Sequence, residues 1–339
     1  MIYNNILELI GNTPLIKLNN LVKNFPGNYY AKCEFFNPGH SNKDKIALYI
    51  IKEAEKKGLI KPGSTIVETT SGNTGFSLAM VSLVRGYKCI LAVSSKTSQD
   101  KIDILKTMGA KVYVCPSDVS SDDPRSYYQV AKRLNKENKN SFYINQYFND
   151  LNTKAHYLST GQEIWKQTNG KITHLIGCCG TGGTLTGAGE YLKEKKQKIN
   201  IIGVDSYGSV LKKYHETGVF DEQEIYPNRI EGLGKNLIPS ATNFSVIDRF
   251  IKVTDESSAY MAKKIIKNEG MFVGYTSGAA MQAVYQLNKE GVFKDNSNVV
   301  IIYPDHGSRY MSKIYNTKWM EDQGFDNNDE EKVHQIQYI

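Results

Sequence analysis

A short apolar run that breaks into a glycine-rich turn and then continues as a helix constrains this chain more than any other feature. The run covers residues 175–179, the turn is Gly180-Thr181-Gly182-Gly183-Thr184, and the segment that follows ends in cations at residues 193–196. A strand, a glycine turn and a helix start form a cradle in which backbone N–H groups and the helix dipole favour an anion. The loop is therefore predicted to bind phosphate, with a merely structural tight turn as the alternative.

The spacing of these glycines narrows the class of phosphate ligand. The loop lacks the lysine of G-x-x-x-x-G-K-[ST], and its spacing is not G-x-G-x-x-G. Neither a nucleoside triphosphate nor a dinucleotide is expected, which also argues against a nicotinamide-dependent oxidoreductase. The hydroxyl groups of Thr181 and Thr184 add donors that suit one small phosphate monoester.

A second informative stretch surrounds Lys43. Ser41 is a candidate N-cap, and apolar residues between Ile46 and Ala54 recur at helical spacing. This places Lys43 in the first helical turn, where a cation opposes the helix dipole, so its pKa should fall if the side chain is buried. A lysine of lowered pKa is nucleophilic enough to form a Schiff base. A solvated surface lysine is the alternative that this residue alone would favour.

Four motifs in register carry a resemblance to a known family, and the similarity covers about residues 5–325. They are Gly11-Asn12-Thr13-Pro14-Leu15, Ser41-Asn42-Lys43-Asp44-Lys45, Thr70-Ser71-Gly72-Asn73-Thr74-Gly75 and Gly180-Thr181-Gly182-Gly183-Thr184. Together they resemble the pyridoxal-phosphate-dependent β-replacement family of cysteine synthases and cystathionine β-synthases. Residues 33–36 and 303–319 are most similar to the cystathionine β-synthase catalytic core. The resemblance implies the two-lobed α/β, parallel-sheet fold of the tryptophan-synthase-β-like (fold type II) enzymes.

The resemblance also implies roles for individual residues. Lys43 would carry the pyridoxal 5′-phosphate cofactor, and Gly180, Thr181, Gly182, Gly183 and Thr184 would hold its phosphate. The substrate carboxylate is expected to bind Thr70, Ser71, Gly72, Asn73, Thr74 and Gln146, and Asn73 would also bind the ring hydroxyl oxygen of the cofactor. A plain capped turn is the alternative for the loop at residues 70–75.

Thr276 stands where the family usually has a serine that faces the pyridine nitrogen. A neutral hydroxyl cannot hold that nitrogen protonated, so the ring is a weaker electron sink. This favours elimination over transamination or racemisation. A helix N-cap is the alternative role for Thr276.

Two segments depart from the family pattern. The family block Ser-Val-Lys-Asp-Arg is here Ser41-Asn42-Lys43-Asp44-Lys45, and Gly-Ile-Gly-Tyr-Asp is here Gly232-Leu233-Gly234-Lys235-Asn236. Gly232 and Lys235 are expected to border the second substrate. If Lys235 faces the site, it should favour an acceptor or leaving group with an extra negative charge. An exposed loop lysine is the alternative.

The chain is predicted to be one catalytic unit over residues 1–325, followed by a polar tail at residues 326–339. A small mobile lobe is expected at residues 38–147 and a large lobe at residues 1–37 plus 148–325, with closure of the small lobe excluding water. The implied reaction is β-replacement on serine or an O-activated serine through an aminoacrylate, with addition of a thiol. Open alternatives are an O-acetylserine or O-phosphoserine sulfhydrylase, a synthase that uses an amine nucleophile, and a serine or threonine dehydratase.

Net charge, apolar stretches and cysteine content limit the possible binding partners and the cellular compartment. The net charge of +7 is spread along the chain and does not form a basic stripe with aromatics, so no nucleic acid is expected. No apolar stretch approaches the length of a membrane span. Five cysteines without a C-x-x-C pair indicate a reducing compartment. A cytoplasmic homodimer that acts on small amino acids, without a bound metal, is the resulting expectation.

Overall fold

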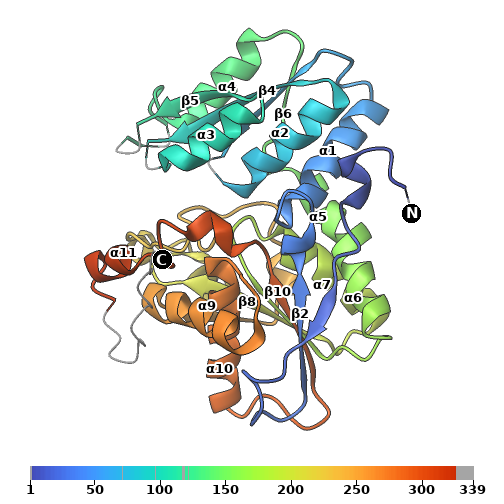
Figure 1. Ribbon diagram of the computed structural model, residues 1–339, viewed down its shortest axis with the longest axis vertical. Coiled ribbons are helices and arrows are strands. Elements are labelled where there is room, and N and C mark those ends of the chain that lie inside the picture. The colour runs from blue at the N-terminus through green and yellow to red at the C-terminus, as the bar shows by residue number, and fades with distance from the viewer. Residues whose placement is uncertain (1, 71, 96, 117–118, 121, 326–339) are drawn as a thin grey trace, which may run out of the picture.

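Two β-sheets, each between layers of helices, make up the fold (Figure 1). The computed structural model describes residues 2–325 except residues 71, 96, 117–118 and 121. The predicted polar tail at residues 326–339 and the predicted ligand Ser71 therefore lie outside the described residues.

The smaller sheet has four strands, all of them parallel, in the order β5-β4-β3-β6. Its strands are β3 (Thr65–Thr69), β4 (Lys88–Ser94), β5 (Lys111–Cys115) and β6 (Ser141–Tyr143). Successive strand residues bury against opposite faces, as a period of two requires. Ile66 packs with residues of the helices α1 (Lys43–Lys56), α2 (Asn73–Arg85) and α3 (Gln99–Thr107), whereas Val67 packs with α4 (Tyr127–Glu137).

The larger sheet has six strands in the order β1-β2-β10-β7-β8-β9. All neighbours pair in parallel except β1 and β2. Its strands are β1 (Leu15–Lys17), β2 (Asn28–Cys33), β7 (His174–Cys178), β8 (Asn200–Ser206), β9 (Arg249–Val253) and β10 (Asn298–Tyr303). Ile176 and Leu175 again point to opposite layers. One layer holds α9 (Asp255–Glu269) and α10 (Tyr275–Lys289), and the other holds α6 (Gln162–Gln167) and α7 (Gly183–Lys195).

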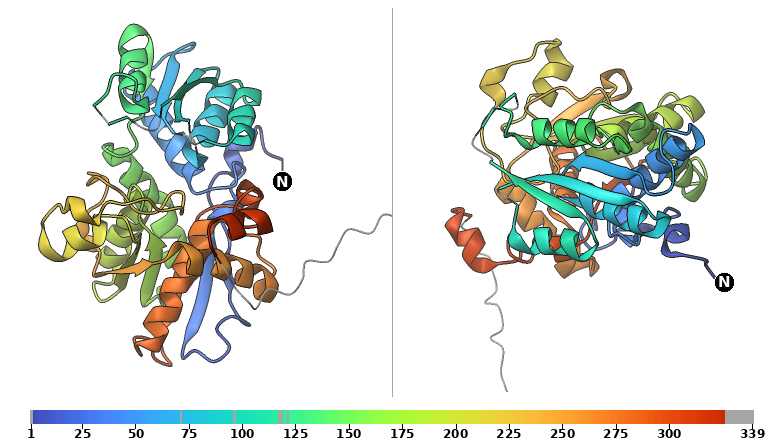
Figure 2. Two further views of the ribbon diagram at one scale, coloured as in Figure 1. Left: turned by 90° about the vertical axis from the view of Figure 1, so that its left-hand side faces the viewer. Right: turned by 90° about the horizontal axis from the view of Figure 1, so that it is seen from above.

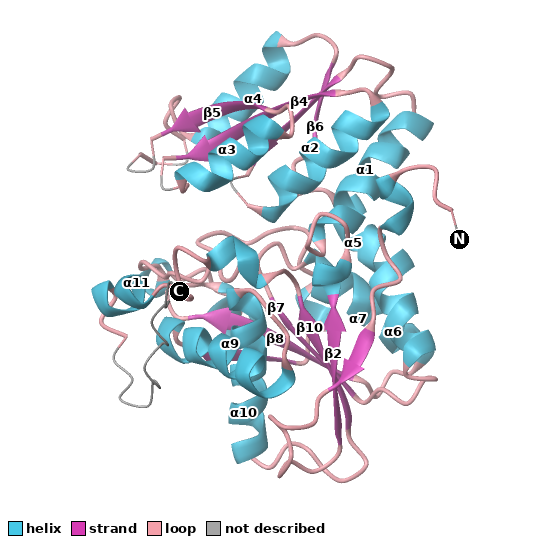
Figure 3. Cartoon of the chain, in the orientation of Figure 1, coloured by secondary structure: helices cyan, strands magenta, loops and turns pink. Residues whose placement is uncertain are grey.

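Shorter elements complete the chain (Figure 3). The remaining helical segments are η1 (Ile6–Leu9), η2 (Glu34–Phe36), α5 (Asp150–His156), the π-helical turn η3 (Tyr157–Gly161), α8 (Leu211–Thr217), η4 (Glu222–Glu224), η5 (Phe244–Val246), η6 (Gly307–Tyr310) and α11 (Thr317–Asp322). The helical segment from residue 150 to 167 is thus α5, a π turn and α6 in succession.

The predicted parallel-sheet α/β fold is confirmed. The four-stranded sheet lies entirely within residues 38–147, and the strands of the larger sheet lie outside that range. Figures 1 and 2 show the smaller sheet and its helices stacked above the larger sheet. The lobe boundaries and the mobility of the small lobe remain predictions.

Both predicted anion loops occupy the same position in their sheets. The loop at residues 70–72 joins the carboxyl end of β3 to the start of α2, and the loop at residues 179–182 joins β7 to α7. The start of α1 is attached to the larger sheet, because the N–H of Asn42 donates to the carbonyl of Pro304, just after β10, at an N···O distance of 2.9 Å. The carboxyl edges of both sheets therefore supply residues to one region.

Candidate active site

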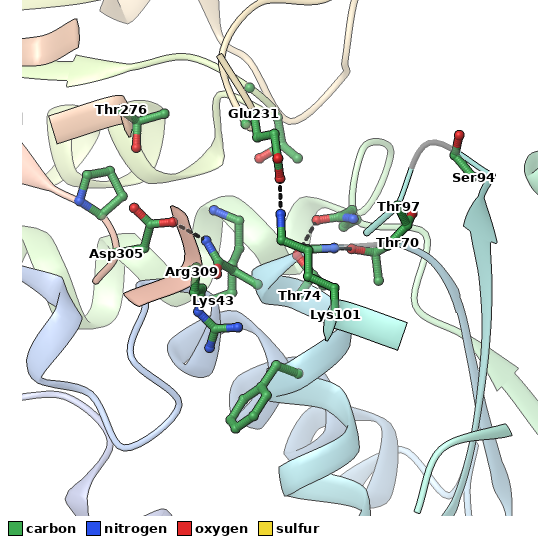
Figure 4. A pocket seen from close by; sticks show the side chains of 18 of the residues that line it. Lys43, Thr70, Thr74, Ser94, Thr97, Lys101, Glu231, Thr276, Asp305 and Arg309 are labelled. Carbon is green, nitrogen blue, oxygen red and sulfur yellow. Dashed lines mark hydrogen bonds and ion pairs between the residues drawn. The ribbon is translucent and has the colours of Figure 1, made fainter. Parts of the chain in front are cut away.

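A cavity of about 590 Å³ opens between the two sheets and contains most of the predicted site residues (Figure 4). The predicted residues that line it are Lys43, Thr70, Gly72, Asn73, Thr74, Gln146, Gly180, Thr181, Gly182, Thr184, Gly232, Lys235 and Thr276. Gly183 does not line it but is the first residue of α7. Segments that are far apart in the sequence thus meet at one site, as expected.

The glycines of the phosphate loop are required by close packing. Gly182 has a φ of +80°, and a Cβ added there would lie 1.9 Å from Thr242 Oγ1. A Cβ at Gly183 would lie 2.3 Å from Asn152 Oδ1. The first N–H groups of α7 have no carbonyl partner within the helix, so they can point at an anion. The backbone of this loop is therefore tightly packed at the start of α7.

Lys43 is the first residue of α1, which confirms its predicted place in the first helical turn. The residue directly before the helix is Asn42, which makes no side-chain cap bond, and the predicted cap Ser41 lies one residue earlier, where its Oγ accepts from the N–H of Lys43 at 3.3 Å. Burial lowers the pKa of Lys43 to about 8, and the charge of Lys235 acts in the same direction. The Nζ of Lys43 donates to Asn42 Oδ1 at 2.9 Å. At neutral to mildly alkaline pH this amine is available as a nucleophile or a base.

The first turn of α2 and the segment after β6 place hydroxyl and amide groups at the cavity. The hydroxyl of Thr74 donates to Gln146 Oε1 at 2.8 Å, and the backbone N–H of Gln146 donates to Glu68 Oε2 at 3.0 Å. Burial raises the pKa of Glu68 to about 7. At Gly72, in contrast to the phosphate loop, an added Cβ would find nothing within 4 Å.

Asp305 is a site residue that was not predicted from the sequence. It follows β10, is fully buried, and accepts hydrogen bonds at Oδ2 from Asn73 Nδ2 and from the hydroxyl of Tyr310, each at 2.7 Å. The bond to Asn73 fixes the amide of that side chain. Burial raises the pKa of Asp305, while its hydrogen bonds oppose the rise. Its position just beyond a buried strand, among residues similar to the family, was the available signal.

Thr276 lies in the first turn of α10, at the edge of the cavity (Figure 4). The helix begins at Tyr275 and its N-cap is Gly274, so the alternative role of Thr276 as an N-cap is wrong. The thiol of Cys178 donates to the carbonyl of Thr276 at an S···O distance of 3.2 Å.

Lys235 faces the cavity and is not a freely moving loop lysine. Its backbone N–H donates to Ser209 Oγ at 2.9 Å, and its carbonyl accepts from the N–H of Val210 at 3.0 Å. Its Nζ donates to the hydroxyl of Tyr147 at 3.3 Å and lies 4.9 Å from the centre of that ring. No acidic side chain among the described residues pairs with it. It therefore gives the cavity a positive charge with no local counter-ion.

The other charged residues at the cavity also leave an excess of cations. Glu231 is paired with both Lys101, from α3, and Lys313, and the pair with Lys101 joins the two halves of the cavity (Figure 4). These contacts hold the pKa of Glu231 below its usual value, against the effect of burial. Within the described ranges, no group of acidic, histidine or cysteine side chains has the arrangement of a metal site. Nor does any described helix have the length and apolar character needed to span a membrane.

Comparisons with known proteins agree with this geometry. The family model described as "Pyridoxal-phosphate dependent enzyme" matches residues 6–305. The chain is 45% identical to cystathionine beta-synthase of Apis mellifera over 322 residues, which are 94% of this chain and 63% of that protein. It is 38% identical to cysteine synthase of Staphylococcus aureus over 309 residues, which are 91% of this chain and 95% of that protein. The crystal structure of O-ureido-L-serine synthase superposes with a TM-score of 0.84 at 30% identity, covering 92% of this chain and 95% of that one. The chain thus spans less than two thirds of the length of the bee synthase.

Proposed function

Because this chain belongs to the pyridoxal-phosphate dependent enzyme family, we propose that it catalyses β-replacement on serine or an O-activated serine, with a thiol as the incoming nucleophile. The observation that carries the proposal is the shared cavity, in which Lys43, the phosphate loop and the threonine-lined loop after β3 meet. Relatives named cystathionine beta-synthase and cysteine synthase, both similar over more than nine tenths of this chain, support the same class of reaction.

The residues at the cavity fit pyridoxal phosphate. The tightly packed glycines at 182 and 183 leave a cradle that a Cβ would fill, and Lys43 offers an amine of lowered pKa beside it. Gly180 to Thr184 would hold the phosphate, Lys43 the aldehyde carbon, Asn73 the ring hydroxyl oxygen and Thr276 the ring nitrogen. When bound, the cofactor supplies an electron sink for negative charge at the substrate α-carbon.

The chain's own residues supply the binding and the proton transfer. Thr70, Thr74 and Gln146 would bind and orient the substrate carboxylate, with Glu68 fixing the backbone of Gln146. The amine of Lys43 would then take the proton from the substrate α-carbon, since a base with a pKa near the working pH is the most effective. The ion pair of Lys101 and Glu231 joins the two halves of the cavity, and would restrict the entry of water.

The charge of the cavity favours one group of second substrates. Lys235 has no acidic partner among the described residues, so we propose that the acceptor or the leaving group has an additional carboxylate or phosphate. Homocysteine as acceptor and O-phosphoserine as donor are both candidates. Sulfide as acceptor and an amine nucleophile remain alternatives.

A matrix of donors and nucleophiles tests this proposal. The purified chain, loaded with pyridoxal phosphate, would be assayed with serine, O-acetylserine and O-phosphoserine against homocysteine, sulfide and a small amine, and the products identified by mass spectrometry. We expect a thioether or thiol product from at least one pair, and more of it than keto acid. Keto acid and ammonia as the only products would contradict β-replacement and favour the dehydratase alternative.

We propose further that the chain acts as a homodimer in the cytoplasm. This rests on the family resemblance and on the cysteine pattern of the sequence. Sedimentation equilibrium over a range of concentrations tests the first part, and fractionation of cells of the source organism tests the second.

A further inference from the structure

A buried chain of polar side chains runs from the phosphate loop to a cluster of charges beneath α1. The hydroxyl oxygen of Thr184 lies 3.0 Å from Asn42 Nδ2 and 3.0 Å from His156 Nε2. On the other side of the ring, His156 Nδ1 lies 2.9 Å from Thr160 Oγ1. Thr160 Oγ1 in turn lies 3.0 Å from the Nζ of Lys45. Both His156 and Thr160 are fully buried.

Lys45 sets the direction of these hydrogen bonds. Its ammonium group has three N–H bonds and no acceptor. They go to Glu34 Oε1 at 2.7 Å, to Glu163 Oε2 at 3.0 Å and to Thr160 Oγ1 at 3.0 Å. Thr160 therefore accepts from Lys45, and its own hydroxyl hydrogen is left for His156 Nδ1.

If the hydrogen bond between His156 and Thr160 ran in the opposite direction, a buried donor would be left without a partner. If His156 were protonated at Nδ1, the hydroxyl hydrogen of Thr160 would have no acceptor among the described residues. Buried donors without a partner are rare in folded proteins. Burial and the charges of Lys45 and Lys43 also hold the pKa of His156 well below its usual value, so the ring is neutral and carries one N–H. That N–H belongs on Nε2, which faces Thr184.

We propose that this chain of hydrogen bonds makes Thr184 an obligate donor into the cavity, aimed at the phosphate of the cofactor. Asn42 and His156 both donate to the hydroxyl oxygen of Thr184 and occupy its two lone pairs. The hydroxyl hydrogen of Thr184 is then the one part of the group free to meet a ligand. His156, Thr160 and Lys45 do not line the cavity and act as positioning residues, because they determine what Thr184 offers, and Asn42, which does line the cavity, adds the second donor to Thr184. The proposal rests on the cofactor and is independent of the reaction proposed above.

Two of these hydrogen-bonded residues, Asn42 and Lys45, lie at positions where the sequence departs from the family block. Asn42 replaces a valine, which could not donate to Thr184, and Lys45 replaces an arginine. Both residues therefore belong to the hydrogen-bond network that makes Thr184 a donor.

The tautomer of His156 is the first test. The chain has six histidines, and ¹⁵N labelling of histidine with assignment by His156→Gln would identify the signals of this ring. We expect a neutral ring protonated at Nε2 across neutral pH, with or without cofactor. A ring protonated at Nδ1, or a cationic ring, would overturn the proposal. This measurement uses the wild-type protein and needs no activity.

The second test measures the contribution of the phosphate group to cofactor affinity separately from that of the rest of the cofactor. Thr160→Val removes the hydroxyl at nearly constant volume, and Thr160→Ser keeps it. Thr160 does not line the cavity. We expect the valine variant of the apoprotein to bind pyridoxal phosphate about tenfold more weakly than the serine variant, because one hydrogen bond to a charged group is affected. Binding of pyridoxal, which lacks the phosphate, should be the same in both variants. Equal affinity for pyridoxal phosphate in both, or an equal loss for both ligands in the valine variant, would contradict the proposed role.

Discussion

The two loops predicted to bind anions have the same place in their sheets and differ in how tightly their glycines are packed. At the loop after β7, a Cβ at Gly180, Gly182 or Gly183 would come within 2.4 Å of another group. At the loop after β3, a Cβ at Gly72 would meet nothing within 4 Å. The glycines after β7 are fixed by their surroundings, whereas Gly72 has free space around it.

This difference matches two kinds of ligand. A cofactor that stays bound through many turnovers is best held by a rigid cradle, because no ordering is needed when it binds. A substrate that enters and leaves needs a loop with room to adjust. Lys43 lines the same cavity as residues of both loops, and changes at the loops should separate cofactor retention from substrate binding.

The largest effect is expected for Lys43→Ala, which removes the amine that lines the same cavity as both loops. Turnover should fall by about 10³-fold or more, since both covalent attachment and proton transfer are lost. Lys52→Ala, an exposed lysine on the same helix, is the matched control and should keep wild-type turnover. Steady-state rates and borohydride trapping of the cofactor are the measurements. Normal turnover by the alanine variant would show that another residue is the base.

Substitution of glycine tests the packing difference directly. Gly182→Val or Gly183→Val should weaken cofactor retention by about 10- to 100-fold, because the added atoms must displace Thr242 or Asn152. Gly72→Ala is the comparison in the open loop and should leave retention unchanged. Cofactor remaining after dialysis would be measured by absorbance. Equal retention in all three variants would remove the distinction between a rigid and an open loop.

Thr74→Val should affect the substrate and spare the cofactor. It removes the hydroxyl that donates to Gln146 and would contact the carboxylate. We expect the KM of the amino-acid donor to rise about tenfold, as for the loss of one hydrogen bond to a charged group. Thr74→Ser is the control that keeps the hydroxyl. A fall in cofactor affinity with an unchanged KM would show that Thr74 contacts the cofactor and not the substrate carboxylate.

Lys235→Ala tests whether the positive charge of Lys235 selects a substrate that has an additional negative group. The KM for an acceptor or donor with an additional negative group should rise about fivefold, while the KM for sulfide stays the same. Lys235→Arg should keep the preference because it keeps the charge. If the alanine variant changes both values equally, or neither, Lys235 has no part in selecting the substrate.

The smallest effect concerns stability. The pKa of Lys43 falls from 10.5 to about 8 on folding, so the unfolded chain holds more protons than the folded chain between these values. The contribution of Lys43 to the free energy of unfolding of the apoprotein, measured as the difference between the wild type and Lys43→Met, should therefore rise as pH increases from about 8 to about 10.5. Lys43→Met removes a partly buried cation and should stabilise the apoprotein at pH 7 by about 1 kcal/mol, a value reduced for solvent screening. Denaturant unfolding at pH 7 and pH 10 tests this, and a destabilised variant at pH 7 would contradict it.

The sequence by itself determined the local features of the site. The strand, turn and helix around Gly182, and the place of Lys43 in a first helical turn, depend on hydrophobic periodicity and turn residues within short windows. The parallel α/β class followed from the alternation of such units. The resemblance then supplied the cofactor, because its four motifs keep their order and residue types.

Only the tertiary structure decided which distant groups meet. Asp305 and Asn73 are 232 positions apart, and no periodic pattern indicates that the end of β10 lies beside the start of α2. The same is true of Thr184, His156 and Lys45, whose hydrogen bonds join helices that pack from different parts of the chain. The orientation of Lys235 was equally open, because a lysine in a polar loop has the same sequence signature whether it faces solvent or a cavity. Burial and contact between remote segments set the pKa of Lys43 and the donor direction at Thr184, and both depend on the packed fold.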